Sequence, residues 1–467
     1  MLLALRLRVW GMRTRACAAF DRTMLYLFYR SYRLSTAVKF FIFRRILPAG
    51  WMALIAAVVV STMLVGSPIS PLYQAFALVV CLTSVALLWA FSRRARLSVT
   101  REVPAFGSVD QPFRYQVMVE GSETRDCRFQ ETLPDPRPSW ENFALSREPG
   151  EAQRNGFDRF SAFNRWQWLL DKRQLFQGGD SLGLVSTKAE GKTRVSMEIT
   201  PKKRGMIELN DLRVLLPDPF HFFQRARKVS APAAHIAILP RRYRLPALRL
   251  PGEAQFQAGD DATSRQHGSS GEFTSLREYR LGDPPRLIHW KSWAKTGRPI
   301  IKEVEDVFFP RYALVLDTFA QESSELAFEE AVSVAASFVS EIDTEQSMLD
   351  LMFLGDSDHV ITAGKGMADS VKLLEALAAV DLSESENFEQ LTRLILRHRA
   401  DLSACICVFT GWSQSRLDFL RGIQSQGLAC VAVAVLQGTE TELPPGDVAR
   451  IHVTQVQEDL LKMTVGR

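Results

Sequence analysis

An uncharged stretch dominates the first quarter of the chain. From Ile46 to Ser92, 47 consecutive residues include no Asp, Glu, Lys or Arg. About 20 apolar residues in a helix cross the hydrocarbon core of a bilayer, so this stretch is long enough for two crossings. Pro68 and Pro71 oppose one continuous helix. We therefore predict a transmembrane hairpin over residues 47–92, with helices at about 47–66 and 71–91.

Basic residues flank both predicted helices. Lys39, Arg44 and Arg45 precede the first helix, and Arg93 and Arg94 follow the second. Positive residues near membrane helices favour the cytoplasmic side, so we expect a multi-pass protein with both termini in the cytoplasm. The first helix begins too far from the N-terminus for a removed signal peptide.

Charge is distributed unevenly along the chain. Residues 1–46 carry a net charge of +9, and residues 47–467 sum to −4. Aromatic residues such as Trp10 and Tyr29 are mixed with the basic ones, which is typical of a segment lying on an anionic leaflet. Nucleic-acid binding also uses basic and aromatic residues. The acidic balance after residue 46 argues against it, so we expect membrane lipids, and no nucleic acid, as partners.

Residues 93–248 alternate apolar and polar positions in short runs. Tyr115, Val117 and Val119, for example, are separated by polar residues or Met118. Runs of this kind, broken by Gly and Pro, predict an antiparallel β-sandwich-like domain. Residues 147–192 are less regular and stay unassigned, apart from a small apolar cluster expected at Trp166, Trp168 and Leu169.

From Tyr312 onward, apolar runs alternate with helical stretches. We expect strands at 313–316, 348–354, 404–409 and 428–436, and helices at 324–342, 367–380, 386–399 and 413–425. This alternation predicts a doubly wound parallel sheet over residues 312–440, followed by a C-terminal segment at 441–467. Cys405 and Cys407 alternate within an apolar run and are expected to be core residues.

The densest mixture of charged and apolar residues is the segment 272–311. A polar stretch at 249–271, expected to be a linker or loop, precedes it. Burying Leu276, Trp290 and Trp293 would draw charged neighbours to the edge of a core, where each charge needs a partner. Three interpretations follow: an ion-paired joint between the β-rich and α/β domains with both tryptophans packed beneath it, a docking surface for a partner, or a catalytic site.

This segment resembles a known family. The run from Ser275 to Asp283, with Arg286 and the pair His289-Trp290 after it, resembles the signature of the bacterial "domain of unknown function 58" family. Lys203-Arg204-Gly205 and Asp218-Pro219-Phe220 resemble its upstream pattern, with His221 where that family usually has Gly. The candidate binding residues of the signature are Arg277, Glu278, Tyr279, Arg280, Gly282, Asp283, Arg286, His289, Trp290 and Lys295.

The resemblance has several implications. It implies a bacterial inner-membrane setting, a von Willebrand factor A-like fold for the α/β domain, and a MoxR-type AAA+ ATPase as partner, but no established reaction. The chain has no Walker motif of its own, which fits a protein that works beside an ATPase.

Domains of the von Willebrand A type often bind Mg²⁺ through an Asp-x-Ser-x-Ser loop after the first strand. Of that loop this chain keeps only Asp317, since Phe319 and Gln321 replace the two serines. A second carboxylate is also missing from Thr410-Gly411-Trp412. Hard divalent cations need several well-placed oxygens, so we expect a degenerate metal-site position at Asp317, with no metal and no cofactor.

Taken together, these patterns favour a membrane-anchored, non-enzymatic scaffold or adaptor that works with a MoxR-type AAA+ ATPase through its cytoplasmic domains. One alternative is a hydrolase-type enzyme acting on an envelope or lipid-linked substrate, with His289 as general base. A pocket joining His289 to Asp283 would favour it. The second alternative is a nucleic-acid-binding membrane protein. We assign no catalytic residue.

Overall fold

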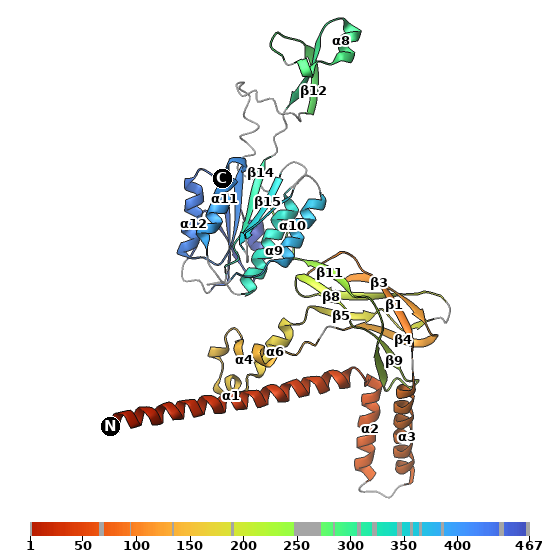
Figure 1. Cartoon of the computed structure of the whole chain (residues 1–467). Helices are drawn as coiled ribbons and strands as arrows, with labels where there is room; N and C mark the ends of the chain where they lie inside the picture. The colour runs from red at the N-terminus through yellow and green to blue at the C-terminus, as the bar shows by residue number, and fades with distance from the viewer. Residues whose placement is uncertain are drawn as a thin grey trace. The chain divides into compact units, whose positions relative to one another are not determined.

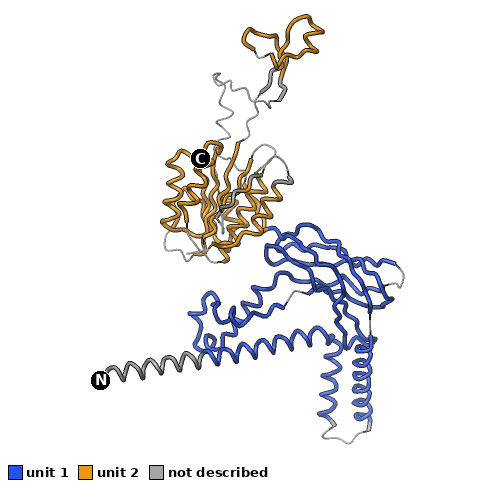
Figure 2. Tube along the Cα trace, viewed as in Figure 1, with its two compact units in different colours: residues 1–239 blue, residues 240–467 orange. Residues whose placement is uncertain are grey.

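The computed structural model covers the whole chain. It describes residues 2–64, 70–93, 95–132, 135–187, 191–246, 272–283, 285–305, 310–319, 325–342, 348–354, 358–363, 367–383, 387–438 and 443–463. The chain divides into two compact units, residues 1–239 and residues 240–467, which Figure 2 distinguishes by colour.

Three helices begin the first unit (Figure 1): α1 (Leu2–Phe43), α2 (Pro48–Leu64) and α3 (Ser70–Ser92). Within the described residues, the part of α3 from Pro71 to Ser92 is the one stretch long and apolar enough to cross a membrane, and α2 is a shorter apolar helix. Helices α2 and α3 contact each other, yet Met52 and Leu88 are 67% and 71% exposed. The connection predicted between the two helices lies largely outside the described residues.

The middle of α1 packs against protein. Its partners are α4 (Trp140–Leu145), α5 (Gly156–Ser161) and α6 (Phe163–Lys172). Tyr29 is 4% exposed, its hydroxyl donates to the carbonyl of Pro138 at 3.1 Å, and its ring lies 5.8 Å from that of Trp166. Trp166 Nε1 in turn donates to Thr36 Oγ1 at 3.2 Å. The expectation that the aromatic residues of 1–46 lie on lipid is therefore wrong for Tyr29, which belongs to a protein core.

That core confirms the small apolar cluster predicted between residues 147 and 192. Trp166 and Leu169 are buried in it, and Trp168 packs against it. The first turn of α4 is fixed by Ser139, whose side chain accepts from the N–H of Asn142, as expected of an N-cap residue. A short 3-10 turn, η1 (Glu151–Gln153), lies between α4 and α5.

The remainder of the first unit consists of β-strands. The larger sheet runs in the order β1 (Leu97–Glu102), β3 (Phe113–Gly121), β7 (Thr193–Pro201), β5 (Phe176–Ser181), β4 (Thr124–Glu131), β9 (Leu212–Pro217), β10 (Gln224–Lys228), with β6 (Val185–Thr187) paired to β4. The smaller sheet runs β2 (Phe106–Ser108), β11 (Ala234–Leu239), β8 (Gly205–Leu209). The pairings within the larger sheet are antiparallel, as predicted.

Both sheets contribute to one hydrophobic core. Val117 and Met197 from the larger sheet and Ile236 and Ile238 from the smaller one belong to the same buried cluster. Along β3 the buried residues alternate with more exposed ones, so the period of two in the sequence correctly identified the inward face.

The second unit contains an α/β sheet in the order β16 (Asp358–Ala363), β15 (Met348–Leu354), β14 (Arg311–Leu316), β17 (Ala404–Thr410), β18 (Ala429–Leu436), β19 (Val448–His452). Neighbouring strands are parallel except β15 and β16. Its helices are α9 (Glu325–Glu341), α10 (Met367–Ala379), α11 (Phe388–Arg397), α12 (Gln414–Ser425) and α13 (Val456–Lys462), with η3 (Arg399–Asp401) before β17.

This arrangement confirms the predicted α/β region. Each strand and helix expected between residues 313 and 436 is present, and Cys405 and Cys407 are fully buried. The antiparallel strand β16 was not anticipated. The sheet also extends into residues 441–467, where β19 pairs with β18.

The signature segment forms a small hairpin. Strand β12 (Glu272–Glu278) pairs antiparallel with β13 (Ile300–Glu305), and η2 (Pro285–Leu287) and α8 (Trp290–Thr296) lie between them. Ile301, at 2% exposure, provides its buried centre and bridges to Ile288. The polar stretch 249–271 lies outside the described residues.

Candidate functional site

The turn of the signature hairpin is held by one carboxylate. Asp283 accepts from both terminal nitrogens of Arg277, at 2.7 and 2.8 Å, and from the backbone N–H of Arg280 at 2.8 Å. Such forked arginine–carboxylate pairs fix geometry as well as charge. Gly282 lies inside this turn with a φ of +107°, a conformation that side chains other than glycine rarely adopt. Three of the predicted residues, Arg277, Gly282 and Asp283, thus shape the loop.

His289 has a different partner. Its Nδ1 lies 2.6 Å from Ser292 Oγ within the first turn of α8, and its backbone N–H donates to the carbonyl of Ile300 at 2.8 Å. Glu278 pairs with Arg298 at 3.2 Å, with both side chains more than 70% exposed. The described contacts therefore do not join His289 to Asp283. Arg286 and Lys295 are exposed, and Tyr279 contributes a backbone bond to Pro299.

The structure corrects the expectation that the tryptophans of the hairpin are buried. Trp290 is 64% exposed and stacks on Trp293, with ring centroids 5.3 Å apart and planes inclined by 19°. Leu281 is fully exposed, and Leu276 is 42% exposed. Trp290 is the first residue of α8, a short helix closed by its C-cap Gly297, and its side chain is exposed there. We call Leu276, Leu281, Trp290 and Trp293 the signature patch.

Asp317 follows β14, at the carboxyl edge of the parallel strands, and is 1% exposed. Its Oδ2 accepts from Arg416 Nε at 2.7 Å, from Thr410 Oγ1 at 3.0 Å and from the Thr410 N–H at 3.1 Å. Its Oδ1 accepts from the N–H of Phe319 at 3.0 Å. Guanidinium and N–H donors surround the carboxylate where a divalent cation would require further oxygens, so this set of residues does not fit a metal ion. Gln321 lies outside the described residues.

The upstream motif at 218–223 fastens the β-sheet to the apolar helices. The Asp218 carboxylate accepts from the N–H groups of Phe220 and Phe223, which fixes a tight turn. His221 occupies this turn at a φ of +56°, which explains why glycine would suit the position. The turn presents the carbonyl of Phe222 to the N–H of Leu47 at 3.0 Å, immediately before α2.

Helix α3 is tied to the same edge of the sheet. Arg225 on β10 donates to the carbonyls of Phe91 and Arg93 at the end of α3. Arg93 donates to the carbonyl of Pro217 at 2.9 Å. Strand β10 therefore joins the bases of both apolar helices.

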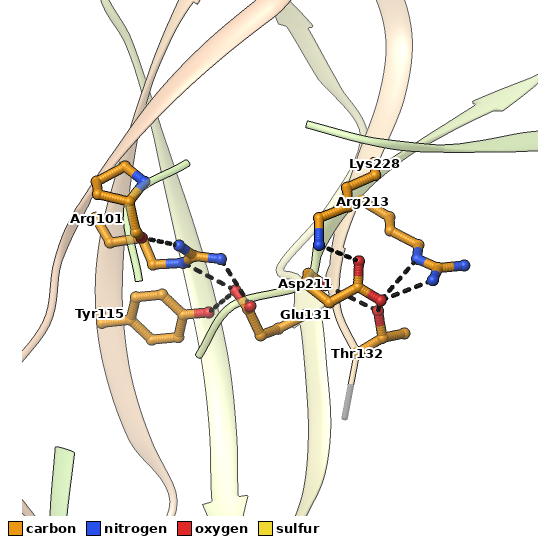
Figure 3. A network of polar contacts seen from close by, with 8 residues as sticks. Arg101, Tyr115, Glu131, Thr132, Asp211, Arg213 and Lys228 are labelled. Carbon is orange, nitrogen blue, oxygen red and sulfur yellow. Dashed lines mark hydrogen bonds and ion pairs between the residues drawn. The ribbon is translucent and has the colours of Figure 1, made fainter. Parts of the chain in front are cut away.

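Two polar clusters lie among the strands of the first unit (Figure 3). Glu131 is 2% exposed and accepts from Arg101 through both carboxylate oxygens, at 2.8 and 3.1 Å, and from the hydroxyl of Tyr115 at 3.3 Å. Burial raises the pKa of the Glu131 carboxyl, while the hydrogen bonds from Arg101 and Tyr115 act against that rise. Burial also raises the pKa of Tyr115. The Arg101–Glu131 pair links β1 to β4 inside the sheet.

The second cluster is centred on Asp211. Its Oδ2 accepts from Arg213 Nη2 at 2.7 Å and from the hydroxyl of Thr132 at 2.9 Å, and Lys228 Nζ lies 3.6 Å from its Oδ1 (Figure 3). Burial raises the pKa of Asp211, but the hydrogen bonds from Arg213 and Thr132 outweigh it and leave that pKa below its ordinary value. Asp211 and Arg213 line a cavity of about 800 Å³ between the sheet and the end of α1.

The sequence analysis predicted neither this cavity nor the buried Arg101–Glu131 pair, although the sequence contains one signal of the pair. Strand alternation places Arg101 two residues after Val99, and Glu131 two residues after Phe129, so each charge occupies an inward position. Buried charges of opposite sign on different strands indicate a pair. Arg44 and Arg45, in the turn that follows α1, also line this cavity, and no comparable local signal in the sequence points to them.

Comparison with known families supports the resemblance in the second unit. A family model described as "Protein of unknown function DUF58" matches residues 275–464, which include the signature hairpin and the α/β sheet. The upstream motif at 218–223 lies outside the matched range. A search of curated proteins finds no match.

Proposed function

We propose that this protein is a membrane-anchored, non-enzymatic scaffold whose signature hairpin docks a partner protein. The observation that carries the proposal is the exposed stack of Trp290 on Trp293. A large aromatic side chain held outward on an ordered turn has no role in the core of its own hairpin, and Trp is enriched at the energetic centres of protein interfaces. Lys291 and Lys295 flank it, which favours an acidic rim on the partner.

The charged residues of the hairpin support docking over chemistry. Arg277 and Asp283 neutralise each other while shaping the turn, and His289 is engaged with Ser292. A general base would need a substrate proton within reach and a partner that orients its ring for transfer. The contacts of these side chains serve the conformation of the loop.

The setting of the scaffold is a two-pass membrane hairpin with both termini in the cytoplasm. Support comes from the length of α3, from the outward-facing apolar side chains of α2 and α3, and from the basic residues at both bases. Helix α2 has 17 residues, at the lower limit for a span. A core helix of a soluble domain would have its apolar surface covered.

The partner that we propose is a MoxR-type AAA+ ATPase. The resemblance of the signature to the "domain of unknown function 58" family supports it, as does the A-like order of strands and helices in the second unit. Arg416 in place of a cation at Asp317 fits a domain that binds protein surfaces without a metal.

A binding assay tests this proposal. The detergent-solubilised full chain is immobilised, and capture of a purified MoxR-type ATPase is measured for wild type, Trp290→Ala and Leu443→Ala. Leu443 is a matched control because it is 72% exposed in the same unit and outside the signature patch. Removing an aromatic side chain from the centre of an interface weakens the binding free energy by about 2 kcal/mol or more. We therefore expect roughly 30-fold weaker capture for Trp290→Ala and unchanged capture for Leu443→Ala. Equal capture by all three proteins would contradict docking through the patch.

A further inference from the structure

Hydrogen bonds from β10 fix the backbone of Arg44 and Arg45. Both arginines lie between the end of α1 and Pro48, the first residue of α2. Gln224 donates its N–H to the carbonyl of Arg45 at 2.8 Å and its Nε2 to the carbonyl of Arg44 at 3.0 Å. Four residues span at most about 14 Å. If α2 enters the hydrocarbon core at Pro48, both arginines lie within reach of the headgroup layer, which is about 5–8 Å thick on each side.

The two arginines border the cavity of about 800 Å³ described above. Its lining includes the aromatic residues Phe40, Phe41 and Phe43 at the end of α1, and also polar side chains such as Thr132 and Arg213. The volume is that of a typical small-ligand site. A lining that combines aromatic and polar side chains suits an amphipathic molecule.

Arg45 also borders a smaller cavity of about 210 Å³, lined by the base of α3 and by β10. Its guanidinium carbon lies 4.0 Å from the ring centroid of Phe41, so the planar group is oriented by an aromatic face. The side chain is thus placed at the joint of both apolar helices with the sheet.

The carboxylates that line the larger cavity are mostly engaged with other cations. Glu131 pairs with Arg101, Asp135 with Arg137, and Asp211 with Arg213 and Lys228. The remaining one, Asp171, is exposed at the rim.

Arg44 and Arg45 differ from these cations. Over the part of the chain that the structure describes, neither forms a direct ion pair with a carboxylate. Burial lowers the pKa of Arg44, and the nearby guanidinium of Arg213 lowers it further, although Asp211 acts in the opposite direction. A half-buried guanidinium beside a second one is stabilised by an added anion.

We infer that this cavity binds the phosphate of an anionic phospholipid headgroup, with Arg44 and Arg45 as its ligands. Guanidinium groups match phosphate oxygens in a forked geometry, and two arginines without a directly paired carboxylate select an anionic over a zwitterionic lipid. The acyl chains would follow Phe40, Phe41 and the exposed apolar surface of α2. The inference rests on the membrane anchoring proposed above, and it differs from general attraction of a basic segment because it needs two particular arginines.

Native mass spectrometry of the detergent-solubilised full chain tests this assignment. Phosphatidylglycerol, phosphatidylcholine and inorganic phosphate are the probes, added separately and in competition. The variants are Arg44→Gln/Arg45→Gln, the conservative Arg44→Lys/Arg45→Lys, and Arg30→Gln/Lys39→Gln. The last is a matched control, since it removes two positive charges from exposed positions of α1 that do not line the cavity.

We expect the wild type and the control pair to retain phosphatidylglycerol in preference to phosphatidylcholine. The glutamine pair at 44 and 45 should retain it at least tenfold less, and the lysine pair, which keeps the charge and loses the fork, should fall between them. Equal loss in the control pair would indicate general electrostatics and overturn the site. Displacement of phosphatidylglycerol by equimolar inorganic phosphate would overturn the assignment to a lipid.

Failure of this inference is distinguishable from failure of the anchoring proposal. Recovery of wild type in buffer without detergent would remove the anchoring itself. Undiminished phosphatidylglycerol retention by a folded Arg44→Gln/Arg45→Gln protein that still requires detergent would overturn the lipid site alone. Should that pair fail to fold, undiminished retention by the lysine pair would overturn the role of the two arginines as forked ligands of the phosphate.

Discussion

Nε of Arg416 lies 2.7 Å from Oδ2 of Asp317, and both side chains are at most 2% exposed. Asp317 directly follows β14, and Arg416 comes from α12, almost a hundred residues later. The guanidinium of Arg416 compensates the buried negative charge of Asp317, and the pair fastens α12 to the carboxyl end of β14.

Removing Arg416 should be costly because it leaves a buried carboxylate without its counter-charge. We expect Arg416→Ala to lower the free energy of unfolding by about 3–5 kcal/mol. Asp317→Asn/Arg416→Met should recover part of that loss, since both charges are then absent. Urea unfolding followed by tryptophan fluorescence measures the effect, with the exposed Arg393→Ala as control. If Arg416→Ala lowered the free energy of unfolding by less than about 1 kcal/mol, the Asp317–Arg416 pair would be exposed to solvent in the folded protein.

The lowered pKa of Asp211 predicts how the stability of the folded protein depends on pH. Its pKa in the folded protein lies below the ordinary value of 3.8, because the hydrogen bonds from Arg213 and Thr132 outweigh burial. A depressed pKa means that the folded state binds its proton more weakly than the unfolded state, so the stabilisation is complete above pH 3.8 and is lost as pH falls below it.

Asp211→Asn should therefore lower the thermal unfolding midpoint at pH 7, and the difference from wild type should shrink as the pH falls through and below 3.8. Asp447→Asn, at an exposed position, serves as the control. A difference that stays constant from neutral to strongly acidic pH would mean that the Asp211 carboxylate contributes no charge-dependent stability.

Membrane topology provides a third prediction. A reporter enzyme that is active only outside the cytoplasm should be active when inserted at residue 68, between the apolar helices, and inactive when fused after residue 467. The reason is that basic residues flank α2 and α3 on the side of the termini. The same activity at both positions would contradict the two-pass hairpin.

Much of the fold follows from local patterns. The inward residues of β3, such as Val117, alternate with period two, and the parallel strands are continuous apolar runs such as that of β17. Both patterns depend only on neighbours in the sequence, because burial on one face or on two faces dictates residue type directly. The antiparallel β16 was missed because a short edge strand has weaker burial requirements.

The candidate sites were less predictable because they depend on distant segments. Tyr29 and Trp166 meet across more than a hundred residues, and the basic charge around Tyr29 favoured a lipid-facing interpretation. Arg44 and Asp211 line one cavity only because the sheet closes beside α1. In the signature, Trp290 was expected to be buried because it is apolar, but the structure leaves it 64% exposed, as the docking that we propose would require.

Site-specific photo-crosslinking tests the proposed docking most directly. A photoreactive amino acid replaces Trp290 in the full chain within native membranes, and a second variant carries it at Leu443, which is similarly accessible. We predict a crosslinked adduct from position 290 that contains a MoxR-type ATPase, and none from position 443. Crosslinks from position 290 only to lipid or to this chain itself would contradict docking of the ATPase through the signature patch.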